Sequence, residues 1–252
     1  MKSIREQIRQ SVDSELTILL WTGGWDSTFR LLQLLFLEKR EVQPLYVLDL
    51  SHRSPIHELQ AMNEIRRELA SRGMVGDLLK PTIYIDKSEI DINDEISNAW
   101  HRISKKRHLG KQYVWIASLC KQYGLEGIEL SIQKRSSEES ISESLAYNLE
   151  ENRMDADEKT IFNYFSFPII NLNKRDMQHI AERENWMGLM GLTWFCHHPI
   201  YHPFRNGTPC GICNPCRIAV EEGFGHRIPF LLRFGGKYLK KMYHSSIMNF
   251  IK

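Results

Sequence analysis

The chain has 252 residues, 42% of them apolar and 25% charged, which suits one globular domain with an appendage better than two full domains. No apolar stretch approaches the roughly 20 residues of a bilayer span, and no signal-peptide core follows the basic start, so we expect a soluble, cytoplasmic protein without a membrane partner. A net charge of +2 is too small to indicate a nucleic-acid partner by itself.

Strand-type and helix-type patterns alternate along the chain. Apolar runs predict strands at residues 16–21, 44–50, 82–85, 127–132 and 165–169, and helical periodicity predicts helices at 27–39, 59–69, 113–123 and 174–185. Residues 88–110 suggest a helical excursion, and the Ser- and Glu-rich stretch 133–159 suggests a mobile insertion. This alternation predicts an α/β fold with a five-stranded parallel sheet, covered on both faces, that binds ligands at the carboxyl ends of its strands.

A loop rich in glycine and hydroxyl groups joins the first strand to the first helix. Two adjacent glycines allow the backbone to approach a phosphate, and the unpaired N–H groups of a helix N-terminus attract an anion. A simple tight turn is the alternative interpretation. We predict that Asp26 helps to place Mg²⁺ or caps the helix, and that the nucleotide-binding set is Thr22, Gly23, Gly24, Asp26, Ser27 and Thr28.

The loop spacing differs from the longer loop ending in Gly-Lys-Ser/Thr, which argues against an ordinary P-loop NTPase. Thr22-Gly23-Gly24-Trp25-Asp26-Ser27 resembles instead the Ser-Gly-Gly-x-Asp-Ser loop of the PP-loop ATP pyrophosphatases, with Thr22 replacing the first Ser. The resemblance implies a HUP (adenine nucleotide alpha-hydrolase) type fold. It also implies that the loop binds the pyrophosphate end of ATP while a substrate oxygen attacks the α-phosphate.

Four of the five cysteines gather within 21 positions, which favours reduced, metal-binding thiols over a disulfide scaffold. We predict a structural Zn²⁺ site, because a closed four-thiolate site leaves no open position for substrate. An iron–sulfur cluster requires the same thiolates, and His197, His198 or His202 can replace the most distant of them. The remaining thiol, Cys120, is expected in the core, and the predicted ligands are Cys196, Cys210, Cys213 and Cys216.

Further motifs resemble those of the 7-cyano-7-deazaguanine synthases. They are the Leu-Thr-Trp-Phe-Cys tract at 192–196, the Phe-Pro-Ile-Ile-Asn-Leu-Asn-Lys tract at 167–174, and Arg217 after the last cysteine, so the likeness spans residues 16–217. That family implies a homodimer that adenylates 7-carboxy-7-deazaguanine, forms an amide with ammonia and dehydrates it to a nitrile. Lys174 is then predicted to stabilise phosphate charge during adenylation. An exposed lysine in the first helical turn is the plainer interpretation.

The resemblance divides the chain into a leader at residues 1–15, a PP-loop ATP-binding domain at 16–195, and a zinc-binding region with a basic C-terminal helix at 196–252. The tracts at 50–59 and 109–113 and the region after residue 132 depart from the family pattern where substrate should be recognised. His52, Arg53 and His57 are candidate contacts to a carboxylate or phosphate, or simply parts of a polar loop.

Three alternatives stay open. A paralogue could conjugate the activated acid to an amine on a partner protein, docked on the acidic run 138–158 or the basic run 227–252, although both runs also suit solvated surfaces. A tRNA-modifying PP-loop enzyme would require a basic surface and, for a thiolase, a reactive cysteine, for which Cys120 is the spare thiol. A nucleotide-binding scaffold subunit is the non-enzymatic alternative.

Overall fold

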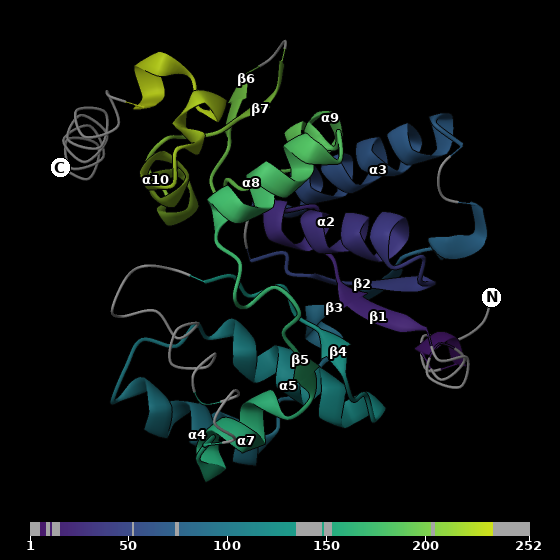
Figure 1. The fold of residues 1–252 in the computed structure, drawn as a ribbon. Coiled ribbons are helices and arrows are strands. Elements are labelled where there is room, and N and C mark those ends of the chain that lie inside the picture. The colour runs from purple at the N-terminus through teal and green to yellow at the C-terminus, as the bar shows by residue number, and fades with distance from the viewer. Residues whose placement is uncertain are drawn as a thin grey trace, which may run out of the picture.

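The computed structural model in Figure 1 describes residues 6–8, 11, 16–51, 53–73, 76–134, 148, 153–202 and 205–233, without the side chains of 201–206. Several predicted features fall outside these ranges: most of the leader, most of the acidic run 138–158, and the basic tail beyond residue 233. His52 and the His202 side chain also lie outside them. Within the described ranges, no helix has the length and apolar character needed to cross a bilayer.

A five-stranded, all-parallel sheet forms the centre of the molecule, as predicted. Its order is β3-β2-β1-β4-β5. The strands are β1 (Thr17–Leu20), β2 (Val42–Leu48), β3 (Ile83–Asp86), β4 (Ile128–Glu129) and β5 (Phe165–Ser166). β1 is buried along its whole length, as expected for a central parallel strand covered on both faces. The architecture is compatible with a Rossmann-like fold.

Helices cover both faces of this sheet (Figure 1). One layer contains α2 (Trp25–Leu32) with its π-helical continuation η1 (Gln33–Leu37), α3 (Pro55–Ser71), α8 (Lys174–Arg183) and α9 (Met187–Gly191). The other contains α4 (Asp94–Ser104), α5 (Gln112–Tyr123) and α7 (Ala156–Phe162). Alternate residues of β1 supply the two cores: Leu19 packs with the first layer, and Ile18 and Leu20 pack with the second.

The topology places a ligand-binding position at the carboxyl end of β1. The chain passes from β1 to β2 and β3 on one side and returns to β4 on the other side. In open α/β sheets, ligands bind where the strand order reverses in this way. The loop at 22–27 begins at this position, between β1 and α2.

Three predictions about local structure need correction. The expected insertion at 133–159 ends too late, because α7 begins at Ala156 behind a capping box in which Asp155 and Glu158 satisfy each other's backbone N–H groups. Glu158 is 2% exposed and also pairs with Arg107, so this segment belongs to the packed domain. The strands predicted at 127–132 and 165–169 are each only two residues long.

The C-terminal region packs onto the layer that contains α2. It consists of the antiparallel pair β6 (Ile200–His202) and β7 (Arg205–Thr208), α10 (Asn214–Glu221) and the 3₁₀ turn η4 (Phe224–Arg227). The cysteines of this region belong to the same apolar cluster as Leu19 and Phe29. The thiol-bearing segment and the helix that follows the loop therefore share one core.

Candidate active site and thiolate centre

Local hydrogen bonds define the shape of the loop at the start of α2. The Ser27 hydroxyl accepts from the Thr22 backbone N–H at 3.3 Å, and the Gly24 N–H donates to Thr22 Oγ1 at 3.4 Å. Gly24 is the N-cap of α2, and Thr28 N–H donates to its carbonyl at 3.0 Å. The loop is thus a compact turn that leads directly into a helix N-terminus, the arrangement expected of an anion-binding loop.

Gly23 is required by both backbone conformation and space. Its φ is +68°, in the left-handed region that favours glycine. A Cβ at this position would lie 2.9 Å from the Glu58 carbonyl oxygen and 3.0 Å from the Met62 side chain. The glycine therefore permits close packing of the loop against α3, in addition to any approach of the backbone to a ligand.

Asp26 and Lys174 meet although 148 residues separate them in the sequence. Lys174 is the first residue of α8, whose N-cap Asn173 forms a capping box with Asp176. From there the Lys174 ammonium reaches across to form an ion pair with the Asp26 carboxylate in the first turn of α2. The side chains are only 15% and 29% exposed, respectively. The two predicted catalytic residues therefore form one charged pair beside the loop.

A cavity of about 600 Å³ opens beside this pair and extends toward the C-terminal region. Thr22, Gly24, Asp26 and Lys174 line it, but the other predicted nucleotide-binding residues, Gly23, Ser27 and Thr28, do not. Thr28 is fully buried, and its hydroxyl accepts a hydrogen bond from the Trp21 indole at 3.1 Å. The Thr28 side chain therefore supports the loop from beneath.

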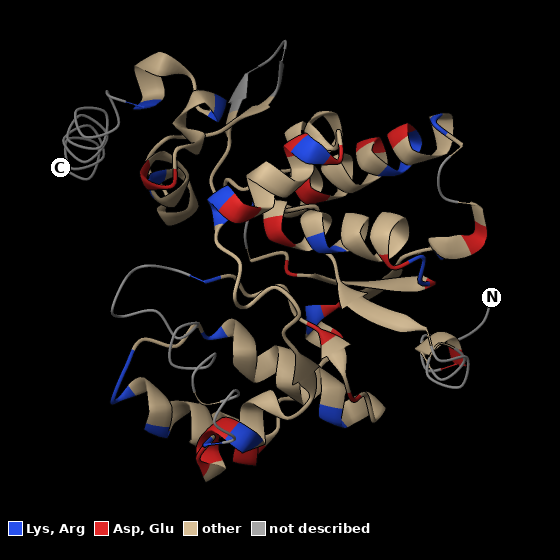
Figure 2. Cartoon of the chain, viewed as in Figure 1, with Lys and Arg blue, Asp and Glu red and all other residues tan. Residues whose placement is uncertain are grey.

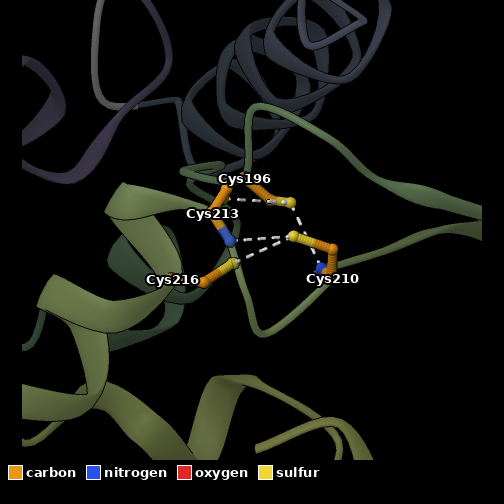
Figure 3. A group of neighbouring side chains, drawn as sticks. All are labelled: Cys196, Cys210, Cys213 and Cys216. Carbon is orange, nitrogen blue, oxygen red and sulfur yellow. Dashed lines mark hydrogen bonds between the residues drawn. The ribbon is translucent and has the colours of Figure 1, made fainter. Parts of the chain in front are cut away.

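Four thiols of the C-terminal region form a compact cluster (Figure 3). Their sulfur atoms all lie within 4.8 Å of one another, with Cys196–Cys213 at 3.8 Å and Cys210–Cys216 at 3.9 Å. A tetrahedron of thiolates around one Zn²⁺ has sulfur atoms about 3.8 Å apart, from a Zn–S distance of about 2.3 Å. The four cysteines can therefore hold a metal ion such as zinc.

Backbone groups support the thiolate cluster. The Cys210 N–H donates to Cys196 Sγ at 3.2 Å, and the Cys213 N–H donates to Cys210 Sγ at 3.3 Å. Hydrogen bonds from the Cys196 and Cys213 thiols lower the pKa of Cys210. All four side chains are at most 8% exposed, so the arrangement is closed to substrate.

Backbone and ring contacts connect the thiolate region to the loop. The Trp194 N–H donates to the Gly23 carbonyl at 2.9 Å, two residues before Cys196. Phe224, eight residues after the last cysteine, packs against Trp25 with ring centroids 4.5 Å apart. The thiolate region thus holds aromatic residues against the loop, and both regions line the same cavity.

The tracts that depart from the family pattern have different positions. His57 is 5% exposed and stacks on Trp194 at 4.6 Å, so it is a packing residue under the β6–β7 pair. Arg53 is exposed and does not line the cavity. The later tract does reach the cavity through Gly110, Gln112 and Tyr113.

Sequence reasoning did not identify several cavity residues. Glu58 lines the cavity and accepts a 2.7 Å hydrogen bond from the Tyr46 hydroxyl, whose pKa is raised by burial and by the Glu58 carboxylate. Phe195, Glu222 and Arg227 line it from the C-terminal side. The Leu-Thr-Trp-Phe-Cys tract was a usable signal for Phe195, whereas nothing in the local sequence distinguished Arg227 from the rest of the basic run.

The interpretation of the site depends on the residues described above. No family model matches the chain, and no curated protein matches it significantly.

Proposed function

We propose that this protein is an ATP-dependent C–N ligase of PP-loop, HUP-type architecture that adenylates a 7-deazaguanine carboxylate. One observation carries the proposal: the Thr22–Ser27 loop, at the switch point of a parallel sheet, opens a helix beside the Asp26–Lys174 pair and a large cavity. A PP-loop enzyme requires a phosphate-binding helix N-terminus, a carboxylate for Mg²⁺ and a cation for phosphate charge at one position. The substrate itself is proposed from the sequence resemblance.

In the proposed reaction, an oxygen of the substrate carboxylate attacks the α-phosphorus of ATP. The bond from that phosphorus to the bridging oxygen breaks, and pyrophosphate leaves with the electron pair. A nitrogen nucleophile then attacks the acyl carbon, AMP leaves, and the nitrogen loses a proton to give an amide. Lys174 would exchange its Asp26 partner for the phosphate oxygens, while Asp26 would hold Mg²⁺.

The thiolate centre has a structural role in this proposal. A Zn²⁺ ion held by Cys196, Cys210, Cys213 and Cys216 would fix the aromatic wall of the cavity without touching the reacting atoms. The separation of the sulfur atoms favours one tetrahedral ion over an iron–sulfur cluster, whose several irons spread their ligands farther apart. Association as a homodimer and docking of a partner protein remain predictions.

The test is pyrophosphate release from ATP with 7-carboxy-7-deazaguanine, with and without ammonia, while mass spectrometry follows the deazaguanine product. We expect pyrophosphate release that depends on the added carboxylic acid substrate. A nitrile product would identify an ordinary synthase, and an adenylate or simple amide would direct the search to another amine, including one on a protein. No release with ATP bound would remove the proposed chemistry and favour a nucleotide-binding scaffold.

Lys174→Met provides the matched test of the site. It should lower the rate of pyrophosphate release by about 10²–10³-fold, the size expected when one preorganised transition-state contact is removed. Lys121→Met is the control, because Lys121 also pairs with a carboxylate, that of Glu95 at 2.9 Å, but on the surface and away from the cavity. Equal rates for the two variants would remove Lys174 from the proposed mechanism.

A thiolase is disfavoured by the position of the spare thiol. Cys120 is 1% exposed in α5, and burial raises its pKa to about 12. A buried, protonated thiol cannot serve as a nucleophile at neutral pH. Lysine and arginine are also interspersed with acidic residues over the described helices in Figure 2, which does not suit an extended tRNA-binding surface.

A further inference from the structure

Arg227 lies in the wall of the cavity and contacts two aromatic rings. It is the last residue of η4, and its guanidinium carbon lies 5.1 Å from the ring centroid of Phe195 and 5.8 Å from that of Trp25. Nη2 donates to the Thr193 carbonyl and, at 3.5 Å, to the Gly191 carbonyl. These contacts fix the guanidinium plane on the segment that is hydrogen-bonded to the loop.

The charge of Arg227 has no acidic partner among the described residues, whereas Lys174 in the same cavity is paired with Asp26. The Nε and Nη1 groups of Arg227 make no hydrogen bond with any described residue. Burial lowers its pKa to about 10, which still leaves the side chain charged at neutral pH. A desolvated charge without a counterion is unfavourable, so an anionic ligand at this position would be bound strongly.

We propose that Arg227 is the receptor for the carboxylate of the acid substrate. This inference rests on the proposed function, because it names the residue that selects the acid in the same cavity. A guanidinium presents parallel N–H donors that match the two oxygens of a carboxylate. The Phe195 and Trp25 rings also line the cavity, which suits the flat ring system of the proposed substrate.

Arg66 provides a matched control elsewhere in the molecule. Its guanidinium lies 5.4 Å from the Trp21 ring centroid, donates to the Lys80 carbonyl and to Thr82 Oγ1, and has a pKa lowered by burial. It therefore shares the aromatic and carbonyl contacts of Arg227, but it does not line the cavity. Removing its charge tests the effect of losing a buried arginine without changing the cavity wall.

The experiment measures dissociation constants by titration calorimetry for ATP, for 7-carboxy-7-deazaguanine and for the corresponding neutral carboxamide. Indole-3-carboxylate serves as a simpler planar acid. The proteins are wild type, Arg227→Met, Arg227→Lys and Arg66→Met, each checked for metal content and circular dichroism.

Arg227→Met should weaken binding of the acids by about 10- to 100-fold, the usual value of a charge-assisted contact, and leave ATP and carboxamide affinity within about twofold. Arg227→Lys should weaken acid binding less, and Arg66→Met should not change it.

The outcomes separate the proposed receptor from the proposed reaction. Equal loss of acid and carboxamide binding, loss of ATP binding alone, or failure of wild type to bind any of these acids would overturn the assignment of Arg227. Pyrophosphate release with unchanged acid affinity in Arg227→Met would overturn it while leaving the reaction intact. A charge-dependent loss with indole-3-carboxylate, without pyrophosphate release from any acid, would support the receptor and remove the proposed reaction.

Discussion

The loop at the start of α2 and the thiolate region line one cavity but are held in place by different physical means. Hydrogen bonds from backbone N–H groups to the Thr22 and Ser27 hydroxyls, a glycine with positive φ and one ion pair define the loop. The thiolate region has two short strands, one eight-residue helix and four clustered sulfurs. The loop should therefore tolerate the loss of the partly exposed Asp26 carboxylate and lose only the proposed activity, whereas the thiolate region should depend on a bound metal for folding.

Cys213→Ser should give the largest effect on stability. Structural Zn²⁺ contributes about 10–16 kcal/mol in small zinc modules, so a lost ligand should lower the free energy of unfolding by at least about 5 kcal/mol. Metal content by mass spectrometry and urea unfolding are the measurements. Cys120→Ala is the control and should retain full metal. Unchanged metal content in Cys213→Ser would contradict the assigned centre.

Glu129→Ala should weaken the contact between β4 and α2, the helix that follows the loop, and leave the loop conformation unchanged. Glu129 on β4 binds Arg30 of α2 through two hydrogen bonds of 2.7 and 2.8 Å, and each side chain is 7% exposed. Burial lowers the pKa of Arg30, but the hydrogen bonds with Glu129 and Glu38 outweigh it and raise the pKa. Removal of one partner of a buried pair costs about 3–5 kcal/mol, although Glu38 should hold the loss near the lower limit.

The double variant Arg30→Met/Glu129→Leu sharpens that test. It removes both charges, so urea unfolding should show recovery of most of the stability that Glu129→Ala loses. A double variant less stable than Glu129→Ala would mean that the ion pair makes a net favourable contribution to stability, beyond offsetting the cost of burying its two charges.

Asp26→Asn should affect the proposed adenylation and leave the fold intact. The pair with Lys174 is partly exposed, so the melting temperature and metal content should stay near those of wild type. Acid-dependent pyrophosphate release should fall by about 10²–10³-fold. Asp157→Asn removes a carboxylate of similar type, paired with Arg102 away from the cavity, and should retain full activity. A large fall in melting temperature for Asp26→Asn alone would show that the two regions do not differ as described.

The sequence predicted the sheet and most helices because apolar periodicity follows burial directly: β1 and β2 are buried on both faces, and α3 buries Met62, Ile65 and Leu69 as expected. The start of α7 was missed because its capping box follows a Ser- and Glu-rich stretch that resembles a loop. The Ser- and Glu-rich composition of the stretch outweighed the capping-box pattern of Asp155 and Glu158.

The site was predictable only where one segment carries the signal. The loop and the cysteine run are local patterns, so both were identified. The packing of α2, β4, α8 and η4 against one another determines three other features. They are the Asp26–Lys174 ion pair, the Arg30–Glu129 ion pair and the position of Arg227. A sequence contains no local mark of such contacts, because each partner is an ordinary charged residue within its own segment.

Gly23→Ala and Gly24→Ala should separate the two roles of the glycine pair. Gly23 combines positive φ with a 2.9 Å contact, so alanine there should cost about 1–3 kcal/mol. Gly24 has φ −78°, and a Cβ there would first meet Thr22 Oγ1 at 3.2 Å, so alanine should cost less than about 1 kcal/mol. Thermal unfolding measures both. Equal losses would show that loop shape does not depend on the conformation of Gly23.

A pH titration should separate metal loss at the thiolate region from the loss of a carboxylate contact at the edge of the sheet, where Asp49 provides the smallest effect. Asp49 follows β2 at the carboxyl edge of the sheet; burial raises its pKa, but hydrogen bonds from Lys87 and Ser51 outweigh this and lower it to about 2 from 3.8. A lowered folded-state pKa contributes stability above the unfolded value of 3.8, and this contribution is lost as the pH falls toward 2. Asp49→Asn should therefore cost up to about 1 kcal/mol at pH 7 and become equal to wild type near pH 2.

Thiolate protonation should release the metal well above that range, so metal loss and the Asp49 effect should occur as two separate steps in a pH titration followed by metal content and urea unfolding. A stability difference between Asp49→Asn and wild type that stays constant from pH 7 to pH 2 would show that the Lys87 pair contributes nothing to this edge of the sheet.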